Sequence, residues 1–182
     1  MKNTYSDYNH FYVFNRLREL NVKKVLDMGG KGRSHNRGCS VIDANIKNGI
    51  DGSNLPFNDD EFDAAISIAT LEHVGNHEKQ KKFIREAIRV SKIISIHWIP
   101  VHSPVESFLK KLGHRHPCII PNCNLILEEI NITGKIIPFT TIKEHLIFLS
   151  VVYPRLNVSK LHQYILNFGK EIYAIILEIE KD

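Results

Sequence analysis

The segment Val25-Leu26-Asp27-Met28-Gly29-Gly30-Lys31-Gly32 joins a short apolar run to a cluster of glycines. Such a run is typical of a buried strand that enters a tight turn. Because glycine has no side chain, the backbone of the turn can approach a ligand closely. Ligands of open α/β sheets bind at the carboxyl ends of the strands. The segment therefore indicates either a nucleotide-like ligand or a turn that only connects two elements.

Predicted strands and helices alternate on both sides of this segment. The pattern predicts an amphipathic helix over 7–20, strands at 25–28, 41–43, 62–68 and 93–98, and a helix over 78–90. This order favours a mainly parallel sheet that is covered on both faces. Further along, we expect helices at 125–130, 142–149 and 159–167 and strands at 135–139 and 171–180. The pattern does not fix the relative direction of the last two strands.

Composition narrows the class of protein. The chain has 182 residues, the size of a single domain, and we treat 1–182 as one domain. Its net charge of +4 is spread without a dense basic stripe, so no nucleic-acid partner is expected. Three cysteines, an odd number, argue against a disulfide framework. The polar start and the absence of a long apolar run predict a cytoplasmic protein without an integral membrane segment.

Acidic residues follow the predicted strands. Asp43 ends the strand at 41–43, where a carboxylate can accept hydrogen bonds from ribose hydroxyls. It follows the glycine turn at a shorter distance than a full dinucleotide-binding unit requires, so the intervening helix must be short. An exposed loop acid is the alternative interpretation. Two later segments, 50–57 and 67–74, also combine acids with small or polar residues at strand ends.

The combination of these segments resembles a known family. The order runs Val-Leu-Asp-Met-Gly-Gly, Asp43, Asp51 with Asn-Leu-Pro-Phe, Glu61-Phe62-Asp63, and Leu71-Glu72-His73-Val74. It resembles the class I S-adenosylmethionine-dependent methyltransferases, and within them the small-molecule group called methyltransferase type 11. The resemblance covers about residues 22–98. It implies a Rossmann-like α/β three-layer sandwich with a mainly parallel sheet of about seven strands, and S-adenosylmethionine as the cofactor.

The resemblance also implies roles for individual residues. Asp27 and Gly29 would line the methionine end of the cofactor, and Asp43 would hold the ribose. Asp51 and Gly52 would lie beside the adenine. The implied cofactor set is Asp27, Gly29, Gly30, Gly32, Asp43, Asp51, Gly52, Leu55, Ser67 and Ala69.

A second group of residues is assigned to the acceptor and to catalysis. His73 is the candidate general base, since it follows a strand at the ligand edge and is neutral near pH 7. Alternatively, Glu72-His73 braces the following helix. Residues 99–123 form the expected acceptor loop or lid, and the proposed acceptor contacts are Glu72, His97, His114, Arg115 and His116. A purely structural loop is the alternative.

A zinc site is a further alternative in the same stretch, with His114, His116, Cys118 and Cys123 as possible ligands. Their spacing does not match a common zinc finger, and we predict no metal.

The sequence predicts a methyltransferase that acts, as a monomer or homodimer, on a small molecule or a sugar or glycan precursor. The glycines of the turn lie two, three and five residues after Asp27, whereas the family places them at two, four and six. This departure motivates a second hypothesis, a non-catalytic cofactor- or partner-binding protein on the same fold. A nicotinamide-dependent oxidoreductase is disfavoured because the turn does not fit Gly-x-Gly-x-x-Gly.

Overall fold

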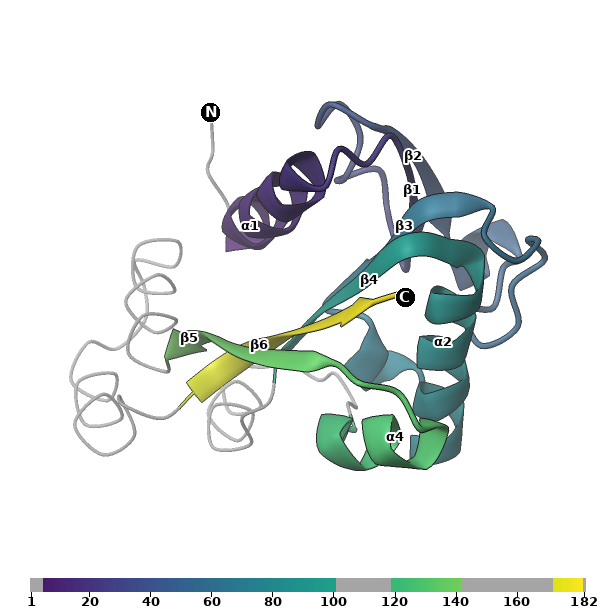
Figure 1. Cartoon of the computed structure of the whole chain (residues 1–182), viewed down its shortest axis with the longest axis vertical. Helices are drawn as coiled ribbons and strands as arrows, with labels where there is room; N and C mark the ends of the chain where they lie inside the picture. Colours follow the sequence, from purple (N-terminus) through teal and green to yellow (C-terminus); the bar gives the residue numbers. More distant parts are fainter. Residues whose placement is uncertain (1–4, 101–118, 142–171, 182) are drawn as a thin grey trace.

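The structure is a computed structural model that describes residues 5–100, 119–141 and 172–181 (Figure 1). Its helical elements are α1 (Tyr5–Glu19), η1 (Ile46–Asn48), η2 (Leu71–His73), α2 (His77–Val90) and α4 (Cys123–Ile130). Its strands are β1 (Lys24–Met28), β2 (Ser40–Ala44), β3 (Phe62–Ile68), β4 (Ser91–Pro100), β5 (Lys135–Thr141) and β6 (Ile172–Glu180). Each predicted helix and strand within the described ranges is confirmed, with ends that differ by a few residues. The helices predicted at 142–149 and 159–167 lie outside the described residues.

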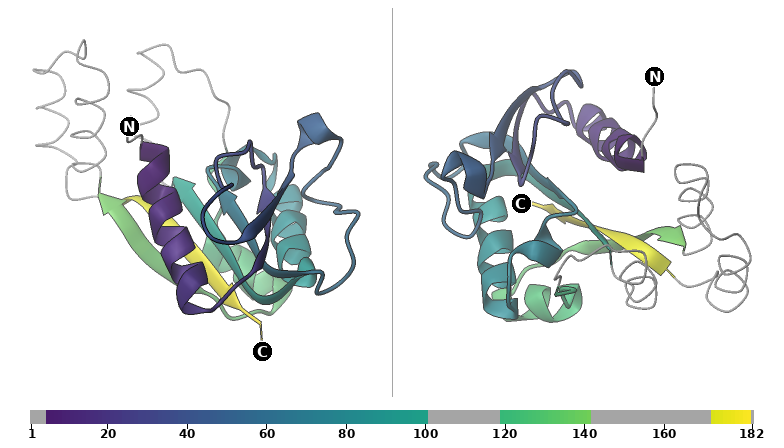
Figure 2. Two further views of the ribbon diagram at one scale, coloured as in Figure 1. Left: turned by 90° about the horizontal axis from the view of Figure 1, so that it is seen from above. Right: turned by 180° about the vertical axis from the view of Figure 1, so that it is seen from behind.

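A single sheet of six strands, in the order β2-β1-β3-β4-β6-β5, forms the centre of the described part. Strands β1 to β4 are parallel to one another, whereas β6 is antiparallel to both β4 and β5. Helix α1 covers one face, and α2 and α4 cover the other (Figures 1 and 2). The predicted three-layer α/β arrangement is therefore confirmed. A seventh strand is not found in the described ranges.

The buried strands supply two cores, one on each face of the sheet. Successive side chains of a strand point to opposite faces. Val25 thus packs with Phe14 of α1, while Leu26 packs with Phe83 and Ile84 of α2. This division explains why the strands read as continuous apolar runs in the sequence. Within the described ranges, no helix has the length and apolarity that crossing a bilayer requires.

The connections between the early elements are short, as predicted. No α-helix lies between β1 and β2, and only the single turn η1 follows β2. At the other end of the sheet, α2 ends at Val90 and β4 begins at Ser91 without a loop between them. Ser91 and Lys92 are thus already part of the strand. The α2–β4 connection lies at the amino ends of the parallel strands, since Ser91 pairs with Phe62 at the start of β3.

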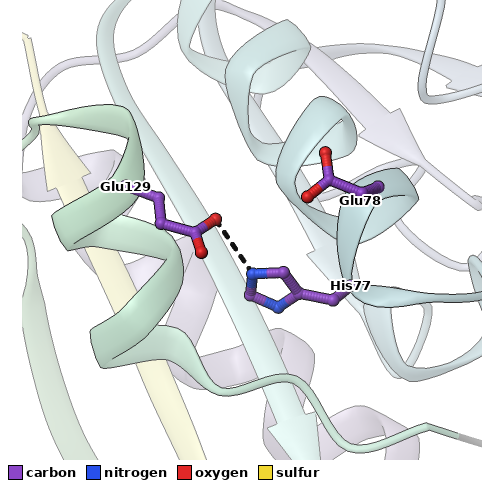
Figure 3. A group of neighbouring side chains, drawn as sticks. All are labelled: His77, Glu78 and Glu129. Atoms are coloured by element: carbon purple, nitrogen blue, oxygen red, sulfur yellow. Dashed lines mark hydrogen bonds and ion pairs between the residues drawn. The ribbon is translucent and has the colours of Figure 1, made fainter.

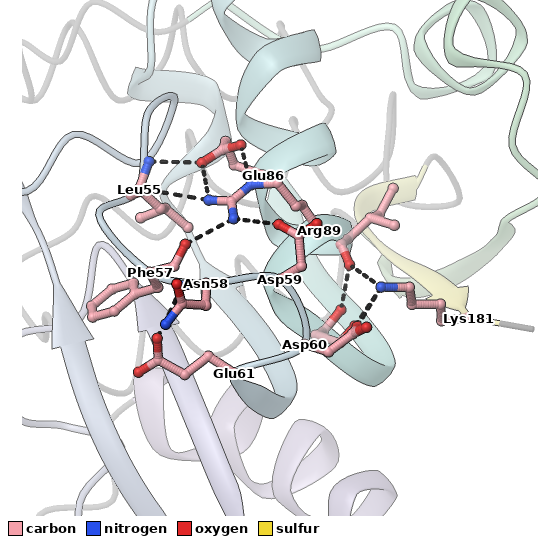
Figure 4. Close-up of polar contacts among 11 residues, drawn as sticks. Leu55, Phe57, Asn58, Asp59, Asp60, Glu61, Glu86, Arg89 and Lys181 are labelled. Carbon is pink, nitrogen blue, oxygen red and sulfur yellow. Dashed lines mark hydrogen bonds and ion pairs between the residues drawn. The ribbon is translucent and has the colours of Figure 1, made fainter.

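Arg89 fastens the segment before β3 to α2 (Figure 4). Its guanidinium donates to the backbone carbonyls of Leu55 and Phe57, at 3.2 and 2.8 Å. It also pairs with Glu86 at 2.7 Å and with Asp59 at 2.8 Å. Glu86 in turn accepts from the backbone amide of Leu55 at 2.7 Å. These hydrogen bonds raise the pKa of Arg89 further, and they set the position of the 55–59 turn.

Replacing Arg89 is expected to destabilise the fold. In Arg89→Ala two backbone carbonyls and two carboxylates lose their donor, which costs about 1–3 kcal/mol of unfolding free energy. Urea denaturation followed by circular dichroism measures the change. Arg85→Ala, an exposed arginine on the same helix, is the control and should change stability by less than about 0.5 kcal/mol. Equal effects of the two variants would contradict the role assigned to Arg89.

Candidate functional site

Two carboxylates lie side by side at the carboxyl ends of β1 and β2. The parallel register pairs Asp27 with Asp43. The turn after β1 folds back onto them, and a Cβ atom on Gly30 would lie 2.2 Å from Asp43 Oδ1 and 2.7 Å from Asp27 Cγ. Only glycine fits at that position without moving the acids. The juxtaposition of two acids and bare backbone is the central feature of the site.

Asp27 is almost fully buried, with 3% of its surface exposed. It accepts a short hydrogen bond from the hydroxyl of Ser34, a residue that is itself fully buried. Burial raises the pKa of Asp27 to about 6, and the neighbouring charge of Asp43 acts in the same direction, whereas the Ser34 bond opposes both. The carboxyl group therefore titrates close to neutral pH, an unusual property that occurs often at ligand sites.

Asp43 receives two donors from the same turn. The backbone amide of Gly32 donates to Asp43 Oδ2 at 2.7 Å, and His35 Nε2 lies 3.2 Å from that oxygen. The other oxygen, Oδ1, is buried and has no hydrogen-bond partner among the described residues. A buried carboxylate oxygen without a partner is costly, and it is a natural place for a ligand donor.

Neighbouring turns enclose the acid pair. Asn45 follows β2, and its side chain donates to the carbonyl of Gly30 at 2.7 Å. Gly29 has a φ of +95°, and a Cβ there would lie 2.3 Å from the hydroxyl oxygen of Thr70. Ala69, between β3 and Thr70, has a φ of +52°, which is strained for a residue with a side chain. The turns after β1, β2 and β3 thus converge at one edge of the sheet.

The predicted adenine-side residues lie on the α2 flank. Asp51 accepts from the amide and hydroxyl of Ser53, both at 2.8 Å, and these bonds lower its pKa. A Cβ on Gly52 would lie 2.4 Å from the ring of Phe83, and Leu55 is buried in the same core. The structure thus holds this segment against α2.

Ser67 and His97 form a buried pair between β3 and β4. Ser67 Oγ and His97 Nδ1 share a hydrogen bond of 2.8 Å, and both residues are fully buried. Burial lowers the pKa of His97 to about 4, so its imidazole is neutral. Its Nε2 has no partner in the described part of the chain. His97 was predicted to contact the acceptor, but the described residues bury it completely.

Glu72 and His73 follow β3 directly. Glu72 is 3% exposed, and burial raises its pKa from 4.5 to about 7. Its Oε1 lies 3.6 Å from His73 Nε2, while its Oε2 is buried without a partner among the described residues. The side chain of His73 is 43% exposed. A buried acid beside an accessible imidazole can bind or move a proton.

The remaining acceptor residues lie outside the described ranges. They are His114, Arg115 and His116. The possible zinc ligand Cys118 also lies outside these ranges, so the structure does not test the zinc alternative. The fourth possible ligand, Cys123, is buried at the start of α4, and burial raises the pKa of its thiol to about 12.

Another cluster of possible metal ligands joins α2 to α4. It contains His77, Glu78 and Glu129, with His77 Nε2 3.0 Å from Glu129 (Figure 3). The ammonium of Lys81 already contacts both acids, at 2.8 and 2.9 Å. This lysine supplies the positive charge that a metal ion would otherwise provide, so the cluster is explained as an ion-pair network between two helices.

Sequence reasoning missed three residues of the acid-pair region. Ser34 and His35 contact the acids, and Asn45 contacts the turn at Gly30. The first two lie in a turn with no periodic pattern, so no sequence signal marked them. Asn45 follows a predicted strand, and that position could have suggested it. Thr70, which lies against Gly29, belongs to the segment 67–74 that the sequence singled out.

Comparisons with known proteins agree with this geometry. Residues 23–96 match the family described as "Methyltransferase domain". This range contains β1 to β3, α2 and most of β4, and therefore the whole acid-pair region. A stretch of 57 residues is 40% identical to a mouse protein named "Probable tRNA methyltransferase 9B". The match covers 31% of this chain and 11% of that protein, so the chain corresponds to a small part of its relative.

Solved structures share the fold at low sequence identity. Magnesium protoporphyrin IX methyltransferase from Synechocystis PCC 6803, with bound SAH, has a TM-score of 0.54 and 12% identity, over 96% of this chain and 83% of that one. Phosphoethanolamine N-methyltransferase 2 from Haemonchus contortus, in complex with S-adenosyl-L-methionine, has a TM-score of 0.63 and 14% identity, over 96% and 52%. Residues 23–96 are therefore similar to the methyltransferase-domain family, and the chain shares the α/β fold of these solved methyltransferases, in agreement with the resemblance seen in the sequence.

The buried carboxyl of Glu72 predicts a pH-dependent stability. Its pKa is higher in the folded protein than the ordinary 4.5, so the folded state is penalised where the unfolded chain ionises. The penalty is absent below pH 4.5 and complete above about pH 7. Glu72→Gln should therefore gain stability over the wild type as pH rises through this window, on the order of 1–3 kcal/mol at pH 8.

Urea denaturation at pH 4.5, 6 and 8 measures this difference. Glu128→Gln, an exposed acid on α4, is the control and should show no such trend. A difference between Glu72→Gln and the wild type that does not change with pH would contradict the burial of an ionisable carboxyl group.

Proposed function

We propose that the chain binds S-adenosylmethionine at the carboxyl ends of β1, β2 and β3 and transfers its methyl group to an acceptor. The observation that carries this proposal is the carboxylate pair Asp27 and Asp43 beneath Gly30. The family match over residues 23–96 supports it independently, since that match spans the same elements.

The residues present fit such a cofactor. The partnerless Oδ1 of Asp43 suits a ribose hydroxyl donor, and the bare backbone at Gly29 and Gly30 leaves no side chain over the acids. The acidic edge also suits a ligand that carries positive charge. When bound, the cofactor supplies a methyl group activated on a sulfonium. We assign cofactor contact to Asp27, Gly29, Gly30, Gly32, Asp43, Asp51, Gly52, Leu55 and Ala69, and a supporting position to Ser67.

Ser67 is fully buried and supports the site from the core beneath it. Its hydroxyl is held by His97, so the pair fixes the end of β3 where the strained Ala69 begins the next turn. We therefore propose that His97 supports the acceptor side from the core and is not itself exposed to the acceptor.

On the acceptor side, His73 is the proposed general base and Glu72 its neighbour. The exposed imidazole can take a proton from a hydroxyl or amine acceptor and pass it to solvent. The ion-pair distance of 3.6 Å lets ionised Glu72 stabilise the imidazolium that results. His114, Arg115 and His116 are retained as proposed acceptor contacts in the 99–123 loop.

The acceptor class is proposed from the sequence. A small molecule or a sugar or glycan precursor is expected, since no dense basic stripe marks a nucleic-acid surface. The names of the related proteins differ widely in acceptor, from a porphyrin to phosphoethanolamine and tRNA. A panel of acceptors must therefore include small alcohols, amines, nucleotide sugars and tRNA.

Cofactor affinity tests the proposal directly. Isothermal titration with S-adenosylmethionine and S-adenosylhomocysteine should give saturable binding to the wild type. In Asp43→Ala the ribose loses a charged acceptor, and Kd should rise about tenfold to a hundredfold. Glu78→Ala, an exposed acid on α2, should leave Kd unchanged. No binding to the wild type at millimolar concentration would contradict the proposed function.

The role of His73 is tested on any acceptor that the panel yields. His73→Ala should lower kcat about a hundredfold or more, since a positioned general base contributes that much. Cofactor Kd should stay within about twofold, because the imidazole acts on the acceptor. Steady-state kinetics and titration give the two values. Unchanged kcat would remove His73 as the base.

The second candidate function is a non-catalytic binding protein on the same fold. It is favoured by the contacts of Ser34, His35 and Gly32 with the two acids, which occupy one oxygen of each carboxylate. Cofactor binding without methyl transfer to any member of the panel would favour this alternative.

A further inference from the structure

Residues 31–38, here called the strap, lie over the acid pair and supply three donors to it. Ser34 Oγ donates to Asp27, and the Gly32 amide donates to Asp43 at 2.7 Å. His35 Nε2 lies 3.2 Å from the same oxygen of Asp43. These donors have the chemistry of ribose hydroxyls, which also present hydrogen to a carboxylate. The strap and a nucleoside would therefore compete for the same oxygens.

The three contacts are unequal. Ser34 and Asp27 are both buried, so their hydrogen bond is shielded from water and strong. His35 is 47% exposed and Asp43 14% exposed, so their contact is weakened by solvent. Of residues 31–38, only Ser34 is buried. His35 is thus the contact that can be released while Ser34 stays anchored.

The backbone is suited to such a release. Gly32 and Gly38 stand near the two ends of the strap, and both have positive φ, at +76° and +93°. A Cβ at either position would meet no atom within 4 Å, so neither glycine is held by close packing. Residues near segment ends with free backbone rotation can absorb the changes of φ and ψ that a moving loop requires.

We propose that the strap is an autoinhibitory element that occupies the ribose-binding carboxylate, and that His35 must leave Asp43 before a nucleoside cofactor binds. This inference rests on the proposed function. The closed strap reduces the fraction of molecules that are competent to bind, and the apparent affinity falls by that fraction. Weakening the strap therefore tightens binding, whereas a loss of affinity is the usual result when a residue of a binding site is removed.

The affinity of His35→Ala for S-adenosylhomocysteine tests the strap. Kd, measured by isothermal titration at pH 7.5, should fall about two- to fivefold relative to the wild type. His77→Ala is the matched control, because His77 forms a similar exposed contact of 3.0 Å with Glu129 on another part of the surface. Its Kd should equal that of the wild type. His35→Gln keeps a donor and should restore the wild-type Kd.

The outcomes separate the strap from the proposed function. If both proteins bind, but His35→Ala binds equally or more weakly, the strap is overturned and the cofactor proposal stands. If only His35→Ala binds, both are supported. If neither binds at millimolar concentration, both fail. Thermal melting of each variant confirms that the exposed substitution leaves the fold intact.

Discussion

The in-register parallel pairing of β1 with β2 places Asp27 beside Asp43, and the geometry of the whole edge follows from this. Two adjacent carboxylates repel each other and lose water on burial, so they require nearby donors. The turn after β1 supplies these donors from Gly32, Ser34 and His35. Because the backbone at Gly30 must pass directly over both acids, that position has no room for a side chain.

Because the two acids require donors, the protein's own turn also contacts the carboxylates that a ligand would bind. A site built to bind hydroxyl donors must itself be satisfied when no ligand is present, since an unpaired buried carboxylate is costly. The short turn supplies donors from an exposed histidine and a buried serine, and the buried Asp43 Oδ1 has no hydrogen-bond partner among the described residues. With a turn in place of the usual helix after β1, the protein's own groups donate to the acids when no ligand is bound. It does not remove the acids or the bare backbone.

Contacts on the α2 face hold both ends of the central strands. The direct passage from α2 into β4 and the Arg89 contacts with the 55–59 turn fix the amino ends of β3 and β4, and the buried Ser67–His97 pair lies near their carboxyl ends. Gly52 packs on the Phe83 ring of the same helix. Glu72 is buried at the junction of β3 and α2, where its carboxyl group destabilises the fold above neutral pH. A destabilising buried acid beside an exposed histidine is typical of a functional position.

The sequence by itself determined the order of the elements, the parallel core and the two acids, because strand periodicity, glycine clusters and strand-end acids are local signals. The described residues contain six of the about seven strands expected, and the sequence left the direction of β5 and β6 open, since pairing depends on distant residues. Only the tertiary structure decided that Ser34 and His35 contact the acids and that His97 is buried. These facts depend on how segments distant in sequence pack together, and no local pattern of residue types encodes such packing.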